Sequence, residues 1–180
     1  MRPVLSAMAN QGAPYKGVLY AGLMLTESGP TVLEFNCRLG DPETQVVIPL
    51  LKSDPLELMM ACAQGNLGQT EVIWDDKTYV GIVMVSGGYP GEYQTGFQIA
   101  GLDEDGPEDT MVFHAGTKLD QAGTPLTSGG RVLTVVGGGD DLKAAKKRAY
   151  SRLESISFQG ARWRRDIGSS ANQGAAQATR

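Results

Sequence analysis

The sequence predicts an α+β fold that is built in two consecutive parts. In the first part, two strand-like runs flank the turn residues TESGP, and two short helices follow them. In the second part, which begins near Gly65, short β-rich runs are separated by glycine, proline and aspartate and lead to one long amphipathic helix. Strands and helices grouped in this way, instead of alternating regularly, are typical of antiparallel sheets with helices packed against them.

The first part opens with a predicted helix, MRPVLSAMANQG, which ends at Gly12. The run from Leu19 to Leu25 is apolar on both faces, and this pattern predicts a strand inside a covered sheet. Residues 28–30 are turn residues, so the next run, TVLEFNCRL, is predicted to return antiparallel to the first. One face of this second strand is expected to pack into the core, and its members are Leu33, Phe35, Cys37 and Leu39.

Two helix starts share one pattern, an aspartate that can cap the helix followed by a proline. Asp41 and Pro42 predict a helix that begins at Pro42, which would bring helical N–H groups close to the end of the second strand. Asp54 and Pro55 predict another helix, which ends at Gly65. Its apolar residues recur at helical spacing and are expected to pack into the core; they are Leu56, Met59, Met60 and Ala63.

The second part contains four β-rich runs, YVGIVMVSGGYPGEY, FQIAGL, TMVFHAG and GRVLTVVGGG. The core face of the helix that follows is predicted to consist of Leu142, Ala145, Ala149, Leu153 and Ile156. The basic side chains of this helix are expected to be solvated, and they are Lys143, Lys146, Lys147 and Arg152. We therefore expect residues 1–65 to end one domain, residues 66–168 to form a small α+β domain, and residues 169–180 to be a disordered tail with little to bury.

The composition excludes several classes of partner. The net charge of −4 and the pI of about 5.0 argue against a nucleic-acid-binding surface and against a polybasic membrane patch. No apolar run is long enough for a transmembrane helix. The chain has two cysteines and no CxxC motif, so neither a disulfide framework nor a zinc site is indicated, and a reduced, cytoplasmic location is expected.

The polar residues of the second strand form the candidate site. Glu34, Asn36 and Arg38 occupy alternate positions, so their side chains are predicted to project from one face. Carboxylate and amide oxygens suit Mg²⁺, which completes its coordination with substrate phosphates and water. The guanidinium of Arg38 suits a phosphate or a carboxylate. A solvent-exposed ion pair between Glu34 and Arg38 explains the same pattern, and spacing does not decide between the two.

A set of motifs adds a resemblance to this pattern. PYKGVLYAGLML, GPTVLEFNCRLGDPETQVVIPLL, GGYPGEYQTGFQIAGL, VFHAGT, SGGRVLTVV and RWRRDIG occur together and in this order. The set resembles the C-terminal part of the phosphoribosylamine–glycine ligase (glycinamide ribonucleotide synthetase) family of ATP-grasp enzymes. The resemblance implies the C-terminal part of an ATP-grasp catalytic domain, an antiparallel sheet with helices, followed by a small α+β C-terminal domain.

The resemblance also implies roles for six residues. Glu34 and Asn36 would be ligands of Mg²⁺ or Mn²⁺, and Arg38 would be the catalytic cation beside the phosphates. Asp41, Pro42 and Glu43 would line the same pocket and bind substrate. The family joins glycine to 5-phosphoribosylamine and uses ATP as co-substrate in purine (IMP) biosynthesis. The chain departs from the family at two packing positions, Leu39 and Trp163, and neither affects the metal assignment.

Members of the family are considerably longer than this chain. We therefore expect a C-terminal fragment that is inactive alone and needs the missing N-terminal ATP-grasp portion, in cis or as a separate chain. Without that portion, the opening helix and strands would expose apolar faces. Two alternatives remain open, namely a subunit of a split ligase and a non-catalytic binding module derived from the ligase.

Three other features favour structural roles. The stretch VVGGGDDLK lacks the GxxxxGK[ST] pattern of a phosphate loop and predicts a tight turn with a helix cap. His114 lies in a short apolar run and is predicted to be a hydrogen-bonded structural residue. The basic run from Arg162 to Arg165 is predicted to be solvated or ion-paired.

Overall fold

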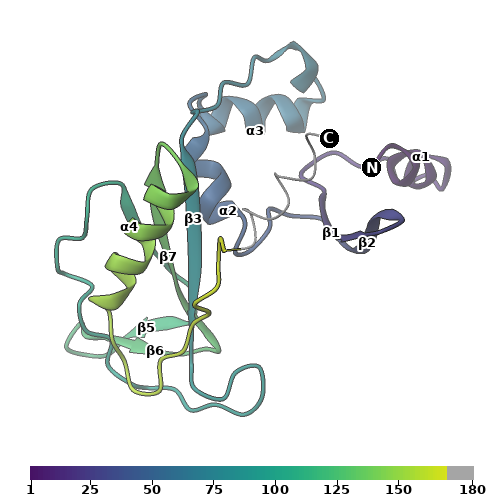
Figure 1. The fold of residues 1–180 in the computed structure, drawn as a ribbon. Coiled ribbons are helices and arrows are strands. Elements are labelled where there is room, and N and C mark those ends of the chain that lie inside the picture. Colours follow the sequence, from purple (N-terminus) through teal and green to yellow (C-terminus); the bar gives the residue numbers. More distant parts are fainter. Residues whose placement is uncertain (170–180) are drawn as a thin grey trace. The chain divides into compact units, whose positions relative to one another are not determined.

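The computed structural model describes residues 1–169, and its helices and antiparallel sheets confirm the predicted α+β class (Figure 1). The chain divides into two compact units, each of which is described by itself. The first unit consists of residues 1–44 and 51–75, and the second contains residues 45–50 and the chain from Asp76 onward. Apart from Ser169, the predicted tail at 169–180 lies outside the described residues.

The first unit is built around one hairpin. Strand β1 (Tyr20–Thr26) pairs antiparallel with β2 (Gly29–Asn36), as predicted. A β-bulge shifts the register between Gly22 and Leu23, so that Leu33 of β2 has no partner on β1. The other elements of this unit are α1 (Arg2–Asn10), α3 (Pro55–Gln64) and the 3₁₀ helix η2 (Leu67–Gln69).

The two predicted helix starts have different outcomes. Asp54 caps α3 by accepting a hydrogen bond from the backbone N–H of Leu56 at 2.8 Å, and Gly65 ends the helix with a φ of 81°, both as predicted. The helix predicted after Asp41 forms, but its predicted start at Pro42 is wrong, because α2 (Thr44–Val47) begins two residues later and continues into the 3₁₀ helix η1 (Ile48–Leu50). The carbonyl of Gly40 accepts both the backbone N–H and the hydroxyl of Thr44, so residues 40–44 form a turn before the helix starts.

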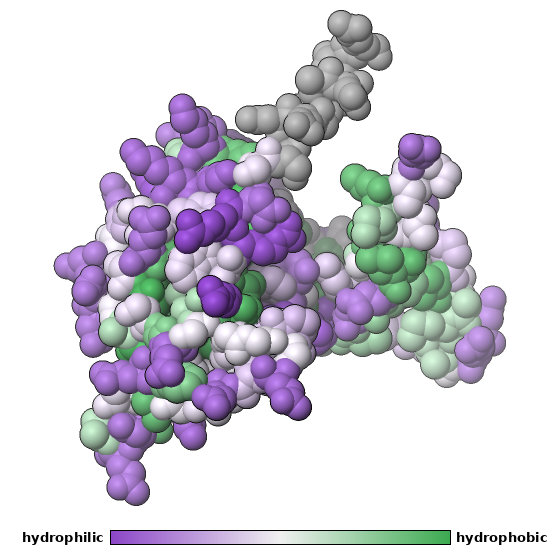
Figure 2. Space-filling model, turned by 60° about the horizontal axis from the view of Figure 1, so that its bottom comes forward, coloured by the Kyte–Doolittle hydropathy of each residue, from purple (hydrophilic) through white to green (hydrophobic). Residues whose placement is uncertain are grey.

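The apolar core predicted for the first unit is absent from the residues that the structure describes, where only Gly40 and Ala61 of this unit are buried. Leu25 is 83% exposed and Leu33 is 63% exposed, because a sheet of two strands leaves both of its faces uncovered. The predicted core face of α3 is also wrong, since the whole set is exposed: Leu56, Met59, Met60 and Ala63. Figure 2 shows apolar side chains, in green, at the molecular surface.

The second unit has a three-stranded antiparallel sheet with the order β3-β7-β4. Its strands are β3 (Thr78–Val85), β4 (Thr110–His114) and β7 (Arg131–Gly139), and α4 (Leu142–Glu154) packs on them. A separate two-stranded sheet joins β5 (Thr117–Leu119) and β6 (Pro125–Thr127). The predicted strand at residues 97–102 is not formed, because Gln98 and Ala100 make only isolated bridges.

The core of the second unit lies between its sheet and α4. The predicted face of α4 is confirmed for Ala145, Ala149 and Leu153, which are buried, and for Leu142, which packs against the core. Ile156 is also buried, but it lies beyond the end of the helix at Glu154. The GGG stretch ends β7 instead of forming a turn. A Cβ on Gly137 would overlap the backbone of α4, so glycine allows the helix to lie directly on the strand. Asp141 then caps α4 through the N–H of Ala144 at 2.7 Å.

The prediction that Arg152 is solvated is wrong. This side chain is only 5% exposed, and its guanidinium donates to the carbonyls of Gly101 and Leu102 at 3.0 and 3.1 Å and to the hydroxyl of Ser155 at 2.7 Å. The three acceptors replace water around the charge. Arg152 therefore ties α4 to the loop at residues 101–102.

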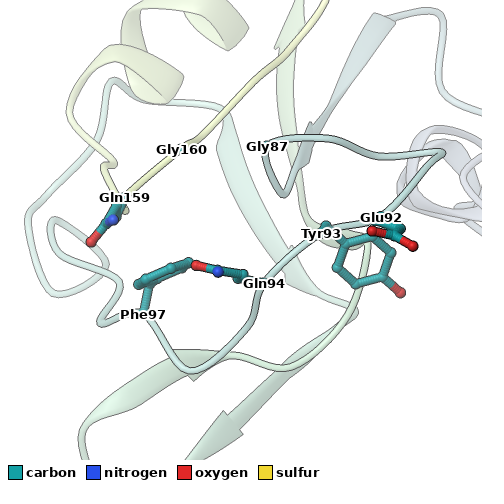
Figure 3. A pocket seen from close by; sticks show the side chains of 7 residues that line it. All are labelled: Gly87, Glu92, Tyr93, Gln94, Phe97, Gln159 and Gly160. Atoms are coloured by element: carbon teal, nitrogen blue, oxygen red, sulfur yellow. The ribbon is translucent and has the colours of Figure 1, made fainter.

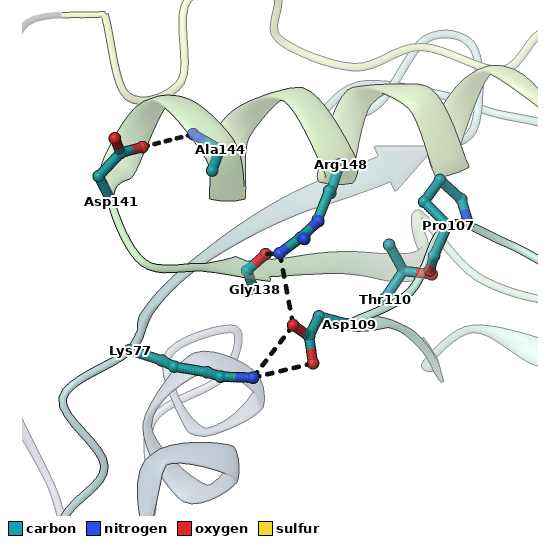
Figure 4. A network of polar contacts seen from close by, with 8 residues as sticks. All are labelled: Lys77, Pro107, Asp109, Thr110, Gly138, Asp141, Ala144 and Arg148. Atoms are coloured by element: carbon teal, nitrogen blue, oxygen red, sulfur yellow. Dashed lines mark hydrogen bonds and ion pairs between the residues drawn. The ribbon is translucent and has the colours of Figure 1, made fainter.

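A polar network joins the start of β3, the start of β4 and α4 (Figure 4). The carboxylate of Asp109 lies 3.0 Å from Lys77 Nζ and 3.3 Å from Arg148 Nη1. Arg148 also donates to the carbonyl of Gly138 at 2.8 Å. The backbone of Asp109 is left-handed, with a φ of 57°, and its carbonyl accepts the N–H of Gly138 at 2.7 Å. Among residues 1–169, no helix is both long and apolar enough to cross a membrane.

Candidate active site

Two of the predicted site residues lie together at the end of β2. Glu34 is opposite Gly22 and Asn36 is opposite Tyr20 in the antiparallel register, which places these four residues on one face of the hairpin. The amide Nδ2 of Asn36 donates to Oε1 of Glu34 at 2.9 Å. A Cβ on Gly22 would lie 3.0 Å from Cγ of Glu34, so the missing side chain leaves the room that Glu34 occupies.

A second polar pair links β1 to the turn after β2. The hydroxyl of Tyr20 donates to Oε1 of Glu43 at 3.0 Å. This hydrogen bond, together with loss of hydration and the nearby negative charges of Glu43 and Glu34, raises the pKa of Tyr20 above its ordinary value. The phenol therefore remains a hydrogen-bond donor at neutral pH. The hydroxyl of Tyr20 thus connects β1 with the turn at 40–44, which contains the predicted substrate-binding residues.

The remaining predicted site residues lie just beyond the strand. β2 ends at Asn36, and the exposed guanidinium of Arg38 donates to the carbonyl of Leu39 at 2.9 Å. Asp41 and Pro42 occupy the turn at 40–44, and the peptide bond between them is cis. The strand alternation therefore brings Glu34 and Asn36 together but does not extend to Arg38.

The donor set of Glu34 and Asn36 fits a hard divalent cation that receives most of its ligands from elsewhere. A carboxylate and an amide offer the oxygen atoms that Mg²⁺ prefers. Within residues 1–169, no group of three or more histidine, cysteine, aspartate or glutamate side chains could hold a metal ion without other donors. Substrate phosphates and water would thus have to complete the coordination.

The second unit contains a hollow of about 410 Å³, which is lined by Gly87, Glu92, Tyr93, Gln94, Phe97, Gln159 and Gly160 (Figure 3). None of the predicted site residues lines it. The side chains that line the hollow include one carboxylate and two amides but no lysine, arginine or histidine. None of them therefore offers a positive charge to a phosphate. The candidate chemistry therefore stays with the residues at the end of β2.

The contacts agree with two of the three structural interpretations and with the helix cap of the third, whose predicted tight turn is replaced by the end of β7. Nδ1 of His114 lies 3.0 Å from the hydroxyl of Thr117, so the predicted hydrogen bond is confirmed, although His114 is exposed. Arg164 pairs with Asp166 and lowers the pKa of that carboxyl, which confirms an ion-paired basic run. No phosphate loop is formed at residues 137–141, which belong to β7 and the cap of α4.

Tyr20 is a polar residue at the site that the sequence did not single out. In the sequence it belongs to an apolar run, and nothing there distinguishes it from a packing residue. The bulge decides its position, since a regular ladder extended from the Leu23–Val32 pair would place Tyr20 opposite Phe35 instead of Asn36. Only the observed register reveals that Tyr20 shares a face with Glu34.

Comparisons with known proteins cover nearly the whole chain. The family model described as "Phosphoribosylglycinamide synthetase, C domain" matches residues 79–170, and the one described as "Phosphoribosylglycinamide synthetase, ATP-grasp (A) domain" matches residues 1–44. The chain is 50% identical over 167 residues to the phosphoribosylamine–glycine ligase of Caldanaerobacter subterraneus subsp. tengcongensis, a match that covers 93% of this chain and 39% of that ligase. It is 49% identical over 169 residues to the trifunctional purine biosynthetic protein adenosine-3 of Gallus gallus, which covers 93% of this chain and 17% of that protein.

The fold comparison agrees with the sequence comparison. The crystal structure of phosphoribosylamine–glycine ligase from Thermotoga maritima matches with a TM-score of 0.71 at 35% identity. The match covers 90% of this chain and 39% of the Thermotoga protein. The chain therefore spans about two fifths of the length of these two ligases.

Proposed function

Because the chain belongs to the phosphoribosylglycinamide synthetase family, we propose that it supplies the metal-binding side of an ATP-dependent ligase that joins glycine to 5-phosphoribosylamine. The Caldanaerobacter and Thermotoga relatives are named ligases, and the Gallus relative is named for purine biosynthesis. Since the chain spans 39% of the Caldanaerobacter ligase, the nucleotide pocket would come from a further ATP-grasp segment, either joined to this chain or supplied separately.

The proposed chemistry begins with transfer of the γ-phosphoryl group of ATP to the carboxylate of glycine. The amine of phosphoribosylamine then attacks the acyl carbon, and phosphate leaves where a free carboxylate oxygen would not. Glu34 and Asn36 would hold Mg²⁺ or Mn²⁺, which offsets the negative charge of the phosphates when bound. Arg38 would stabilise negative charge on the transferred group, while Asp41, Pro42 and Glu43 would line the substrate side.

One observation carries this proposal. The hydrogen-bonded pair of Glu34 and Asn36 shares a face with Tyr20, whose hydroxyl contacts Glu43 at 3.0 Å, so two predicted parts of the site are physically connected. An ordinary solvent-facing ion pair between Glu34 and Arg38 would instead bring those two side chains together. The guanidinium of Arg38 is directed to the carbonyl of Leu39.

The exposed apolar surface of the first unit supports a role for a further segment. Leu23, Met24 and Leu25 of β1 and Val32 and Leu33 of β2 are all more than two fifths exposed. A two-stranded sheet also leaves the backbone groups of its outer edges unpaired. Both features favour association with the rest of an ATP-grasp domain over a free-standing module.

The proposal is tested by reconstitution. The purified 180-residue chain should release no ADP from ATP in the presence of glycine and phosphoribosylamine, because half of a site cannot position the nucleotide. Joining it to the remaining, upstream part of the Caldanaerobacter ligase should give turnover that depends on all three substrates. Glu34→Gln in the joined protein should abolish this turnover, whereas Glu27→Gln at the hairpin tip should not.

Two results would contradict the proposal. Turnover by the isolated chain would show that the chain carries a complete site. A joined protein that is folded and binds ATP, yet does not form the glycine–phosphoribosylamine product, would favour a non-catalytic module.

A further inference from the structure

The contact between Tyr20 and Glu43 is the strongest feature of the site that has no assigned role. It joins residues 23 positions apart in the sequence, whereas the Asn36–Glu34 and Arg38–Leu39 contacts are local. Both side chains are half-buried, whereas most other side chains of the first unit are exposed. Because the contact is half-buried and joins residues far apart in the sequence, it fixes the turn at 40–44 against the hairpin.

Glu43 is held from two sides. Oε1 accepts the hydroxyl of Tyr20, and the rest of the carboxylate lies against Gly40, where a Cβ would overlap Oε2 and would lie 3.1 Å from the Cβ of Glu43. Gly40 is buried, and its carbonyl accepts the N–H of Thr44 at 3.0 Å. The carboxylate orientation and the turn geometry therefore depend on the same few atoms.

The position of Tyr20 depends in turn on the hairpin. Tyr20 pairs with Asn36 at the end of the ladder, so its ring starts from the same face as the Glu34–Asn36 pair. The phenol is neutral and donates a single proton, which suits a carboxylate that must remain charged and correctly directed. A phenylalanine would keep the ring in place but would leave Glu43 without this donor.

We propose that Tyr20 is a positioning residue of the ligase site, which holds Glu43 and the 40–44 turn in a fixed place beside the Glu34–Asn36 pair. This inference rests on the proposed function for its catalytic meaning, while the contact itself is a property of the chain. Tyr20 acts through Glu43 and the turn, and not by touching the reacting atoms.

The first experiment uses the 180-residue chain and measures hydrogen exchange of the Thr44 amide by NMR. Tyr20→Phe and Glu43→Ala should each speed this exchange by about three- to tenfold, because each removes the same partly exposed charged hydrogen bond. The double variant should be no faster than Glu43→Ala alone, since that single variant already removes the contact with Tyr20. Glu43→Gln keeps an acceptor oxygen and should restore most of the protection.

The matched control is Tyr150→Phe, which removes a hydroxyl that donates to the carbonyl of Arg164 in the second unit. It should leave the Thr44 amide unchanged. Unchanged exchange in Tyr20→Phe, or additive effects of the two single variants, would overturn the proposal.

The second experiment uses the joined ligase described above. Tyr20→Phe should raise KM for glycine by about tenfold and leave KM for ATP within about twofold, because the turn lies on the proposed substrate side. A residue that merely supports folding would lower the active fraction, and hence kcat, without moving any KM. A fall in kcat with KM for glycine unchanged, or an equal rise in KM for glycine and for ATP, would therefore overturn the positioning role.

The two experiments separate the inference from the function on which it rests. If the joined protein is inactive, the proposed function fails, and the exchange data alone decide whether Tyr20 holds the turn. If the joined protein is active and Tyr20→Phe behaves as the wild type, the inference fails and the proposed function stands.

Discussion

Replacing Arg152 with alanine should strongly destabilise the second unit. The side chain is 5% exposed and makes three hydrogen bonds, to the carbonyls of Gly101 and Leu102 and to the hydroxyl of Ser155. A hydrogen bond from a charged group contributes about 1.5–3 kcal/mol, and the two carbonyls can regain water at the surface after truncation. We therefore expect a loss of about 3 kcal/mol, compared with less than about 0.5 kcal/mol for a solvated arginine.

The measurement follows unfolding of the second unit by urea. The chain has two tryptophans, and Trp163 packs against the core of this unit, so a Trp74→Phe background leaves one fluorescent reporter. For a unit of this size, 3 kcal/mol also corresponds to a fall in Tm of roughly 12 °C or more. Lys147→Ala, at an exposed site on the same helix, is the control and should shift neither the urea midpoint nor Tm. A change in Arg152→Ala as small as that of the control would refute the reasoning from burial.

Other expected outcomes concern packing, metal binding and pH. Gly137→Ala should lower the free energy of unfolding by about 1–3 kcal/mol, because its Cβ would overlap the backbone of α4. Gly68→Ala is the control and should leave the free energy of unfolding unchanged, because nothing lies close to that position. Equal urea midpoints for the two variants would contradict this reasoning. Glu34→Gln should weaken Mn²⁺ binding by about tenfold or more in an electron paramagnetic resonance titration, whereas Glu27→Gln should leave it unchanged. Equal losses of Mn²⁺ affinity in the two variants would argue against Glu34 as a metal ligand. Since its contact with a carboxylate raises the pKa of Tyr20 above the ordinary value of 10.0, that contact should be intact at neutral pH and lost only as the pH rises through the raised value. Tyrosinate absorbance that is missing in Tyr20→Phe reports this step, and ionisation at or below pH 10.0 would argue against the hydrogen bond.

Local patterns were sufficient for much of the fold. The cap at Asp54, the end of α3 at Gly65 and the buried face of α4 depend on residues within one or two turns, and all three predictions are confirmed. The burial of Arg152 is not predicted because two of its three acceptors lie 51 and 50 positions earlier in the chain. Sequence spacing on one helix contains no information about such a loop.

The candidate site shows the same division. Alternation along β2 predicts that Glu34 and Asn36 share a face, and their 2.9 Å hydrogen bond agrees with it. Alternation fails for Arg38, because the strand ends two residues earlier, at Asn36. Tyr20 was missed because a one-residue bulge determines its partner, and bulges leave no reliable signal in a single sequence. The metal and substrate roles of these residues stay predictions.

The bulge at Leu33 also bears on how this hairpin can change during evolution. Leu33 has no partner on β1 and is 63% exposed, so its loss would remove neither a cross-strand pair nor a core contact. Its deletion would bring Glu34 next to Val32 and restore a regular ladder, with Tyr20 still opposite Asn36. A one-residue deletion elsewhere in β2 would shift one end of the ladder and turn side chains to the other face. The hairpin thus has one position at which its length can vary while the polar face stays in register.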